Sequence, residues 1–202
     1  MEKLTQKEVW NNIALDWKEF RQKPRKEVIE FLNECGGNLL DIGCGSGRHF
    51  LRKEGLKVFG VDFSEKMIEL AKQNVEKENL SLELKLMEDK IPYSNEYFDN
   101  FICIAVLHCI ETEKRRIDFL REIVRVLKKE GKGFLEVWSR NQKRVKNREK
   151  DSFIPWTARN QKFNRYYYLY DLEELKKELE SVGFKILEIK EKDNIEVLVE
   201  KI

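Results

Sequence analysis

Three closely spaced glycines directly after a short apolar run limit this chain to a small set of folds. Residues 38–42 read Asn-Leu-Leu-Asp-Ile, and residues 43–47 continue as Gly-Cys-Gly-Ser-Gly. An apolar run of this length before a glycine cluster is typical of a buried strand that enters a tight turn. In a sheet of parallel strands, ligands bind beyond the carboxyl ends of the strands, so we expect a ligand near this turn.

The remainder of the chain alternates between strand and helix patterns. Strands are predicted over 38–42, 57–61, 82–86, 99–106, 134–138, 184–190 and 195–200, and helices over 7–32 (interrupted at Pro24), 65–78, 113–129 and 172–182. Ser64, Thr112 and Asp171 are the expected N-caps of the last three helices. The pattern predicts an α/β fold, a Rossmann-like open and mostly parallel seven-stranded sheet with a C-terminal antiparallel hairpin and helices on both faces.

Composition excludes several classes of protein. The 202 residues are 41% apolar and 11% aromatic, too apolar for a disordered chain, and we expect them to form a single domain (1–202). No apolar run approaches the ~20 residues that cross a bilayer, and the first residues do not resemble a signal peptide. Four cysteines without a Cys-x-x-Cys pair and two histidines predict no metal site. We therefore expect a cytoplasmic, reduced protein without membrane contact.

Basic residues are concentrated in one segment. Residues 140–165 carry nine basic and two acidic side chains, whereas the whole chain has a net charge of +2. This asymmetry favours a segment that binds a polyanion, although a solvated loop in a Lys/Glu-rich protein is the alternative. We interpret residues 140–170 as a basic, aromatic insertion before the last helix.

The glycine spacing distinguishes between cofactors. Arg48 stands where the dinucleotide fingerprint Gly-x-Gly-x-x-Gly requires its third glycine, which favours a cofactor without a pyrophosphate. Asp62 ends the second predicted strand, 19 residues after Gly43, where a carboxylate can accept both hydroxyls of a ribose. The pattern therefore predicts an adenosyl ligand. The alternative is that Asp41 and Asp62 are only a helix cap and a turn residue.

With these features the chain resembles the class I S-adenosylmethionine-dependent methyltransferases, whose first motif ends a strand as acid-x-Gly-x-Gly-x-Gly. The resemblance implies S-adenosylmethionine as cofactor, with Asp62 at its ribose and with Asp41, Gly43, Gly45 and Gly47 against its methionine part. The superfamily also has an acid beside the adenine. Here its usual aspartate falls on Met87, so the residues just after it, Glu88 and Asp89, are the predicted contacts, and Ile104 is a further predicted cofactor contact.

The flanking segments resemble a narrower family, the tRNA wobble-uridine carboxymethyl methyltransferases. Residues 10–14 and 20–25 correspond to its Tyr-x-x-Ile-Ala and Thr-Arg-x-x-Pro-Trp, and residues 104–109 to Ile-Ala-Val-Ile-His-His. Residues 154–156 and 163–168 correspond to Val-Pro-Trp and Phe-His-Arg-Tyr-Tyr-His. This chain departs from the family at Trp10, Phe20, Arg25, Cys109 and Tyr168.

The narrower resemblance implies methylation of the carboxylate of 5-carboxymethyluridine in tRNA to a methyl ester. A carboxylate with a reference pKa of about 4 is already ionised at pH 7, so no general base is required. Arg21 is the predicted catalytic clamp for a carboxylate or phosphate, unless it forms a surface salt bridge. His108 is the predicted hydrogen-bond donor to the substrate, unless it is a satisfied loop histidine. Trp10 is expected to cover the cofactor as part of an N-terminal helical lid (1–34), unless it belongs to the core.

The basic segment supplies the predicted substrate contacts, namely Lys143, Arg144, Lys146, Trp156, Arg165 and Tyr167. Cations can neutralise phosphates while aromatic rings stack on the bases of an anticodon loop. The tyrosine run could instead form a buried strand. If it is extended, Arg165 and Tyr167 share one face, and Tyr166 and Tyr168 share the other.

The expected partners are therefore tRNA and, by the same resemblance, a small zinc-binding activator protein. Two other functions remain open. The first is a small-molecule methyltransferase of the same fold, which would not need the basic segment. The second is a binding module without catalysis, against which the intact glycine loop and Asp62 argue.

Overall fold

Strands and helices alternate along most of the computed structural model, which describes residues 4–78, 80 and 82–202. The strands are β1 (Gly37–Ile42), β2 (Leu56–Asp62), β3 (Glu83–Leu86), β4 (Phe98–Ile104), β5 (Leu127–Trp138), β6 (Asp151–Ala158), β7 (Gln161–Tyr168), β8 (Phe184–Glu191) and β9 (Asn194–Lys201). The α-helices are α1 (Gln6–Phe20), α2 (Lys26–Glu34), α3 (Glu65–Lys77), α4 (Glu113–Val126) and α5 (Leu172–Ser181), and a 3₁₀ turn, η1 (Leu107–Cys109), follows β4.

Seven strands form one sheet in the order β3-β2-β1-β4-β5-β9-β8. The first five strands in this order are parallel, and β9 pairs antiparallel with both β5 and β8. The predicted open, mostly parallel sheet with a closing antiparallel hairpin is therefore confirmed. Its order reverses between β1 and β4, which places a ligand site at the carboxyl ends of these strands.

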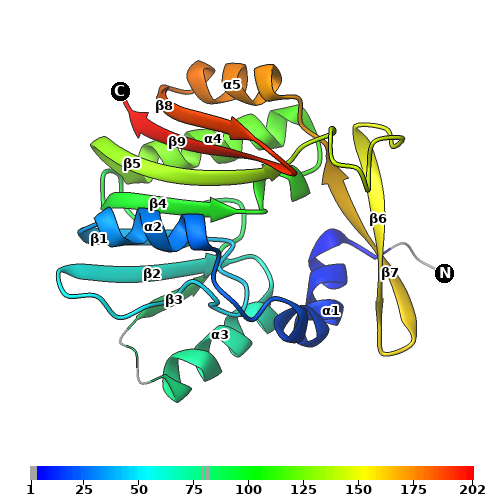
Figure 1. Cartoon of the computed structure of the whole chain (residues 1–202). Coiled ribbons are helices and arrows are strands. Elements are labelled where there is room, and N and C mark those ends of the chain that lie inside the picture. The colour runs from blue at the N-terminus through cyan, green and yellow to red at the C-terminus, as the bar shows by residue number, and fades with distance from the viewer. Residues whose placement is uncertain (1–3, 79, 81) are drawn as a thin grey trace.

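Helices cover both faces of the sheet (Figure 1). Alternate residues of a strand point to opposite faces. Leu40 and Phe101 accordingly pack in one core with residues of α4 and α5, whereas Leu39 and Ile102 pack in another with residues of α2. Two layers of helices therefore bury the central strands.

The predicted interruption of the first helix at Pro24 is confirmed, because the chain leaves helical geometry from Arg21 and resumes it at Lys26. One predicted helix boundary was wrong. The fourth helix ends at Val126, three residues early, because Leu127 already pairs with Phe98 in the sheet.

Two of the three predicted N-caps are confirmed. The hydroxyl of Ser64 accepts from the Met67 N–H, and that of Thr112 accepts from the Arg115 N–H. Asp171 occupies the N-cap position of α5, but its side chain makes no capping hydrogen bond and pairs with Lys150 at 2.7 Å instead. The third prediction is therefore right in position but not in the hydrogen bond.

Residues 151–168 form a separate two-stranded sheet of β6 and β7. Arg159 and Asn160 connect the strands with φ of 48° and 62°, the left-handed conformation of a tight two-residue hairpin turn. The hairpin lies beside α1, near the carboxyl ends of the parallel strands (Figure 1). It thereby borders the region where the topology predicts a ligand.

Both faces of the tyrosine run in β7 are buried. Tyr167 packs in a cluster with Trp10 of α1 and Trp138 of β5, whereas Tyr166 and Tyr168 pack in the core with α4 and α5. The run is thus a buried strand. None of the described helices is long and apolar enough to cross a membrane.

Candidate functional site

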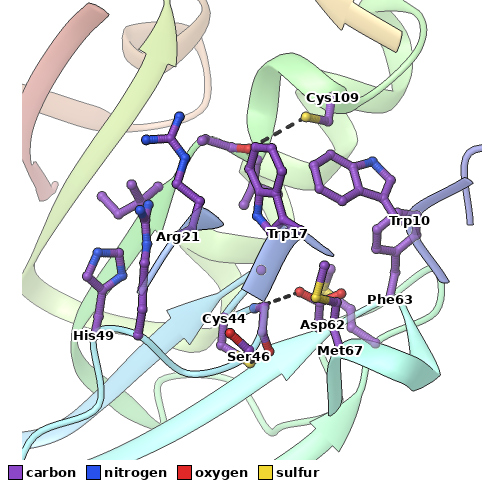
Figure 2. A pocket seen from close by; sticks show the side chains of 17 residues that line it. Trp10, Trp17, Arg21, Cys44, Ser46, His49, Asp62, Phe63, Met67 and Cys109 are labelled. Carbon is purple, nitrogen blue, oxygen red and sulfur yellow. Dashed lines mark hydrogen bonds between the residues drawn. The ribbon is translucent and has the colours of Figure 1, made fainter. Parts of the chain in front are cut away.

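An open cavity with about 770 Å³ of empty space lies at the carboxyl ends of β1, β2 and β4. The glycine loop, the end of β2, the segment after β4 and one face of α1 line it (Figure 2). An open crevice at this place in an α/β sheet is where such folds usually hold a small ligand or cofactor.

The first two glycines of the loop line the cavity. Gly43 has a φ of 68°, and a Cβ at this position would lie 2.2 Å from Cγ2 of Val106. A side chain would therefore be strained and would also collide with the segment after β4. Gly47 is buried against Phe50 and does not line the cavity.

Asp62 joins the end of β2 to the glycine loop. Its Oδ2 accepts from the Gly45 N–H at 2.9 Å, and its Oδ1 accepts from the Ser64 N–H at 2.9 Å. Burial raises the pKa of Asp62 to about 6, although these hydrogen bonds oppose the shift. Each carboxylate oxygen has a second acceptor position, so Asp62 can still receive ribose hydroxyls. The cavity and this carboxylate fit an adenosyl cofactor.

Asp41 lies behind the loop and does not line the cavity. Its side chain is 2% exposed, and its Oδ2 has no hydrogen-bond partner among the residues that the structure describes. Burial raises the pKa of Asp41 to about 7, while Arg48 lowers it. Its predicted contact with the methionine part of the cofactor remains a prediction.

Of the residues around the predicted adenine contact, some line the cavity and others do not. Met87 lines the cavity, and its N–H donates to the backbone oxygen of Asp62. Glu88 and Asp89 are exposed and do not line it. Ile104, at the end of β4, does line it.

One face of α1 forms the wall opposite the glycine loop. Trp10, Trp17 and Arg21 are spaced so that they share a side of the helix, and all three line the cavity. The two indole rings meet edge to face with their centroids 5.2 Å apart. Sequence patterns gave no reason to separate Trp17 from the core, so it was not predicted.

His108 is not at the cavity. Its side chain is fully buried, and Nδ1 accepts from the backbone N–H of Trp138 at 3.2 Å. Burial lowers the pKa of His108 to about 3, assisted by the charge of Arg165. Cys109, the next residue in the turn η1, lines the cavity instead. The predicted contact between His108 and substrate therefore has no support in this geometry.

The predicted substrate-binding residues fall into two groups. Lys143, Arg144 and Lys146 are exposed, and Trp156 is half-buried against Trp17. Arg165 and Tyr167 are 4% and 2% exposed. These last two residues are placed inside the protein, not on a surface that RNA can reach.

Arg165 sits in an aromatic cage that joins the hairpin to α1. Its Cζ lies 5.0 to 5.1 Å from the ring centroids of Trp17, Trp156 and Tyr167, and its Nη1 donates to the Tyr167 hydroxyl at 2.7 Å. Cation–π contacts and a buried hydrogen bond of this kind hold two elements together. The placement favours a packing role for both residues.

Other cavity residues were also missed. Phe63 and Met67 lie beside Asp62, and Arg48 and His49 follow the glycine loop. In the sequence, their position next to recognised motif residues was the signal that could have identified them as cavity residues. Among the described residues, no group of three or more Cys, His, Asp or Glu side chains could hold a metal ion.

Known proteins resemble this chain in sequence. Residues 40–135 match a family described as a methyltransferase domain. A tRNA (carboxymethyluridine(34)-5-O)-methyltransferase of Schizosaccharomyces pombe is 29% identical, over 96% of this chain and 95% of its own length. The chain spans a smaller share of two further curated relatives, 32% and 54% of their lengths.

Solved structures share the fold. An S-adenosylmethionine-dependent methyltransferase of Methanosarcina mazei has a TM-score of 0.72 at 20% identity, over 89% of this chain and 99% of that one. A complex of the Haloferax volcanii Trm112 methyltransferase activator with a methyltransferase has a TM-score of 0.70 at 14% identity, over 99% of each chain. With the glycine loop and Asp62 at one cavity, these findings show that the protein is an S-adenosylmethionine-dependent methyltransferase that resembles the tRNA carboxymethyluridine methyltransferases.

Proposed function

We propose that this methyltransferase converts the carboxylate of 5-carboxymethyluridine, at the wobble position of tRNA, into a methyl ester. The observation that carries the proposal is the meeting of three distant segments, two of which line one cavity while the third packs behind its wall. Arg21, from the N-terminal signature, lines the cavity with Asp62, and Trp156, from the basic segment, packs 5.1 Å from Trp17 on the same helix. These are the segments in which the chain resembles the tRNA enzymes.

The cavity residues suit transfer to a carboxylate. S-adenosylmethionine supplies a methyl group on a sulfonium, and its transfer to a carboxylate oxygen leaves the electron pair of the broken carbon–sulfur bond on sulfur and moves no proton. Asp62 would hold the ribose, while Trp10 and Trp17 would exclude water from the cavity. Arg21 would orient the acceptor by binding its oxyanion. No general base is needed, which agrees with the burial of His108 away from the cavity.

Residues 140–170 would provide the RNA-binding insertion. Lys143, Arg144 and Lys146 are exposed in the segment before β6, and the Cζ of Arg144 lies 5.4 Å from the ring of Trp138. Exposed cations near the cavity can neutralise the phosphates of an anticodon loop. Residues 1–34 would act as the lid over the cofactor, although residues 1–3 lie outside the described part of the chain.

A small zinc-binding activator is the proposed protein partner. The structure of the Haloferax volcanii methyltransferase was solved with the Trm112 activator, and this chain matches 99% of it. If the same association occurs here, the activator would raise the activity of the isolated chain.

Transfer of labelled methyl from S-adenosylmethionine to a tRNA that carries 5-carboxymethyluridine tests the proposal, with and without the activator. We expect labelling that mild alkali removes, because a methyl ester is hydrolysed by base whereas a methylated base or ribose is not. A tRNA with 5-carbamoylmethyluridine is the matched control, since its amide offers no carboxylate. The Asp62→Ala variant controls for contaminating enzymes.

Labelling that survives alkali would contradict the proposed acceptor. No labelling of RNA in either condition, with the cofactor still bound, would favour a small-molecule acceptor instead. Salt separates the two functions further, because transfer to RNA should weaken as salt is raised and transfer to a small molecule should not.

A further inference from the structure

Two arginines that line the cavity form no salt bridge with the residues that the structure describes. Arg21 and Arg48 are both half-buried at the cavity wall. Over residues 4–78, 80 and 82–202, neither guanidinium forms a salt bridge or donates a hydrogen bond to another residue. A partly desolvated guanidinium without an acceptor is unfavourable unless a ligand supplies the missing charge.

The carboxyl groups nearby attract the two arginines but form no salt bridge with either of them among the described residues. Glu136 is 2% exposed and pairs with Arg25, whose Nη1 lies 2.5 Å from its Oε2, and Arg25 also reaches Glu196 at 3.3 Å. Asp41 is buried, and burial raises its pKa to about 7 although the charge of Arg48 lowers it. Arg25 is therefore paired directly within the fold, whereas Arg21 and Arg48 interact with these carboxyl groups only without direct contact.

The two free guanidiniums also affect one another. Burial lowers the pKa of Arg48, and the positive charge of Arg21 lowers it further. Two like charges at one wall of a cavity repel each other, and an anion that binds both of them offsets this repulsion. The arrangement favours binding of a single anion between them.

Arg21 is held in an orientation that leaves its donors available. Its Cζ lies 4.8 Å from the ring centroid of Phe20 and 5.4 Å from that of Trp17. Stacking on aromatic rings uses the faces of a guanidinium, so the N–H groups along its edge can still bind a carboxylate in the bidentate manner. Figure 2 shows Arg21 beside Trp17 at this part of the cavity.

His49 adds a third polar group to the same wall. The imidazole is 4% exposed, lines the cavity, and its Nε2 has no hydrogen-bond partner among the described residues. Burial and the charges of Arg48 and Arg25 lower the pKa of His49 to about 3. The ring is neutral at pH 7 and carries one N–H, which can donate without adding charge.

The position of these residues separates them from the ribose site. In Figure 2, Arg21 and His49 lie on one side of the cavity, and Asp62 and Phe63 lie on the other. If the ribose of the cofactor is at Asp62, the wall formed by Arg21, Arg48 and His49 faces the other end of the cofactor and the acceptor. Two carboxylates could occupy this wall, that of the cofactor or that of the acceptor.

We propose that Arg21 and Arg48, with His49 as an additional donor, form the subsite for the carboxylate of the acceptor. The inference rests on the proposed function and extends it, because it assigns to Arg48 and His49 a role that neither motif implies. It also accounts for release of the product. Methylation removes the negative charge of the acceptor, so the ester loses the attraction that held the substrate.

Binding of two uridine nucleosides to the full chain saturated with S-adenosylhomocysteine tests this subsite. One nucleoside is 5-carboxymethyluridine and the other is 5-carbamoylmethyluridine, and the fluorescence of Trp10 and Trp17 at the cavity reports binding. We expect the carboxylate to bind about tenfold or more tightly than the amide, since hydrogen bonds to a charged group are the stronger ones. Arg48→Met and Arg21→Met should each remove most of this ratio, and Arg48→Lys should keep part of it.

Arg115→Met is the matched control, because Arg115 is exposed on α4 and does not line the cavity. The inference is overturned if wild-type protein binds the two nucleosides equally, or binds neither. It is also overturned if Arg48→Met weakens S-adenosylhomocysteine and leaves the nucleoside ratio unchanged, since the arginines would then hold the cofactor's carboxylate.

The result is independent of whether RNA is the acceptor. Carboxylate selectivity that depends on Arg48, in a protein that does not label tRNA, would uphold the subsite and reject the proposed function. Labelling of tRNA at the wild-type rate by Arg48→Met would reject the subsite and uphold the proposed function.

Discussion

The glycine loop and the β6–β7 hairpin border the same cavity, but their sequences determine their structures in different ways. The loop depends on local backbone conformation, because Gly43 must adopt a positive φ and must lack a side chain beside Val106. The hairpin depends on distant contacts, because Arg165 and Tyr167 are buried by α1 and β5. Conformation at a glycine can be recognised in a short stretch of sequence, whereas burial of an arginine requires knowledge of what packs on it.

The largest expected effect is on cofactor affinity and comes from a change beside the glycine loop. Asp62→Ala removes the acceptor for the ribose and also the anchor of the Gly45 N–H. Two lost hydrogen bonds to a charged group should weaken binding of S-adenosylhomocysteine about 100-fold or more. Isothermal titration calorimetry measures the affinity, and thermal unfolding checks that the variant is folded.

The control for this variant is Asp193→Ala, because Asp193 is exposed in the turn between β8 and β9. It should bind as wild type does. A folded Asp62→Ala variant with unchanged affinity would mean that the cofactor does not use this strand end.

The exposed cations of the basic segment should produce the next largest effect. Changing Lys143, Arg144 and Lys146 together to alanine should weaken tRNA binding about tenfold or more and should flatten its dependence on salt, by about 0.7 in the logarithmic slope for each lost phosphate contact. Fluorescence anisotropy of labelled tRNA at several salt concentrations measures both quantities. Cofactor affinity should not change.

A matched variant changes three exposed lysines near the amino ends of β5 and β8, away from the cavity. They are Lys129, Lys132 and Lys185. The charge removed is the same. If this variant loses as much affinity for tRNA as the first, the basic segment has no special role in binding RNA.

The pH dependence of cofactor binding should be smaller and should come from Asp62. Burial raises the pKa of Asp62 to about 6, and its ionised form is the better acceptor for ribose hydroxyls. Affinity should therefore be constant above pH 6 and should fall by up to about tenfold for each pH unit below it. Calorimetric titrations between pH 5 and pH 8 test the direction.

Asp62→Asn keeps the shape of the side chain but cannot ionise, so its weaker affinity should not vary with pH in this range. Should the variation persist in Asp62→Asn, the titrating group is another one, and Asp41, with a pKa raised to about 7 by burial, is the first to test.

The smallest expected effect concerns stability. Tyr167→Phe removes the hydroxyl that accepts from Arg165 at 2.7 Å, and the buried guanidinium loses this acceptor. The free energy of unfolding should fall by about 1–2 kcal/mol, measured by urea denaturation. Lys143→Ala, in the same segment but exposed, should change it by less than about 0.5 kcal/mol. Equal effects of the two substitutions would remove the distinction between buried and exposed residues of the segment.

The sequence was sufficient to predict the fold and one half of the cavity. Strand patterns predicted the mostly parallel sheet with its closing hairpin, and the glycine spacing with Asp62 predicted where the ligand site lies. Both depend on relations within a few residues or on general rules of topology.

The other half of the cavity depends on geometry that no short pattern carries. His108 and Cys109 are neighbours, and the 3₁₀ turn decides that the thiol lines the cavity while the imidazole is buried. Arg48 was recognised as a departure from a dinucleotide motif, but its lack of a partner could be found only in three dimensions.

The contact between α1 and β7 also determines when the cavity can form. Gln6 accepts a hydrogen bond from the Tyr166 N–H at 2.8 Å, across 160 residues of chain. During synthesis, α1 leaves the ribosome first, but it cannot pack in its final position until the hairpin of β6 and β7 has been synthesised. Long-range contacts of this kind form slowly because a large loop must close. Cofactor binding would therefore begin only after most of the chain has been synthesised.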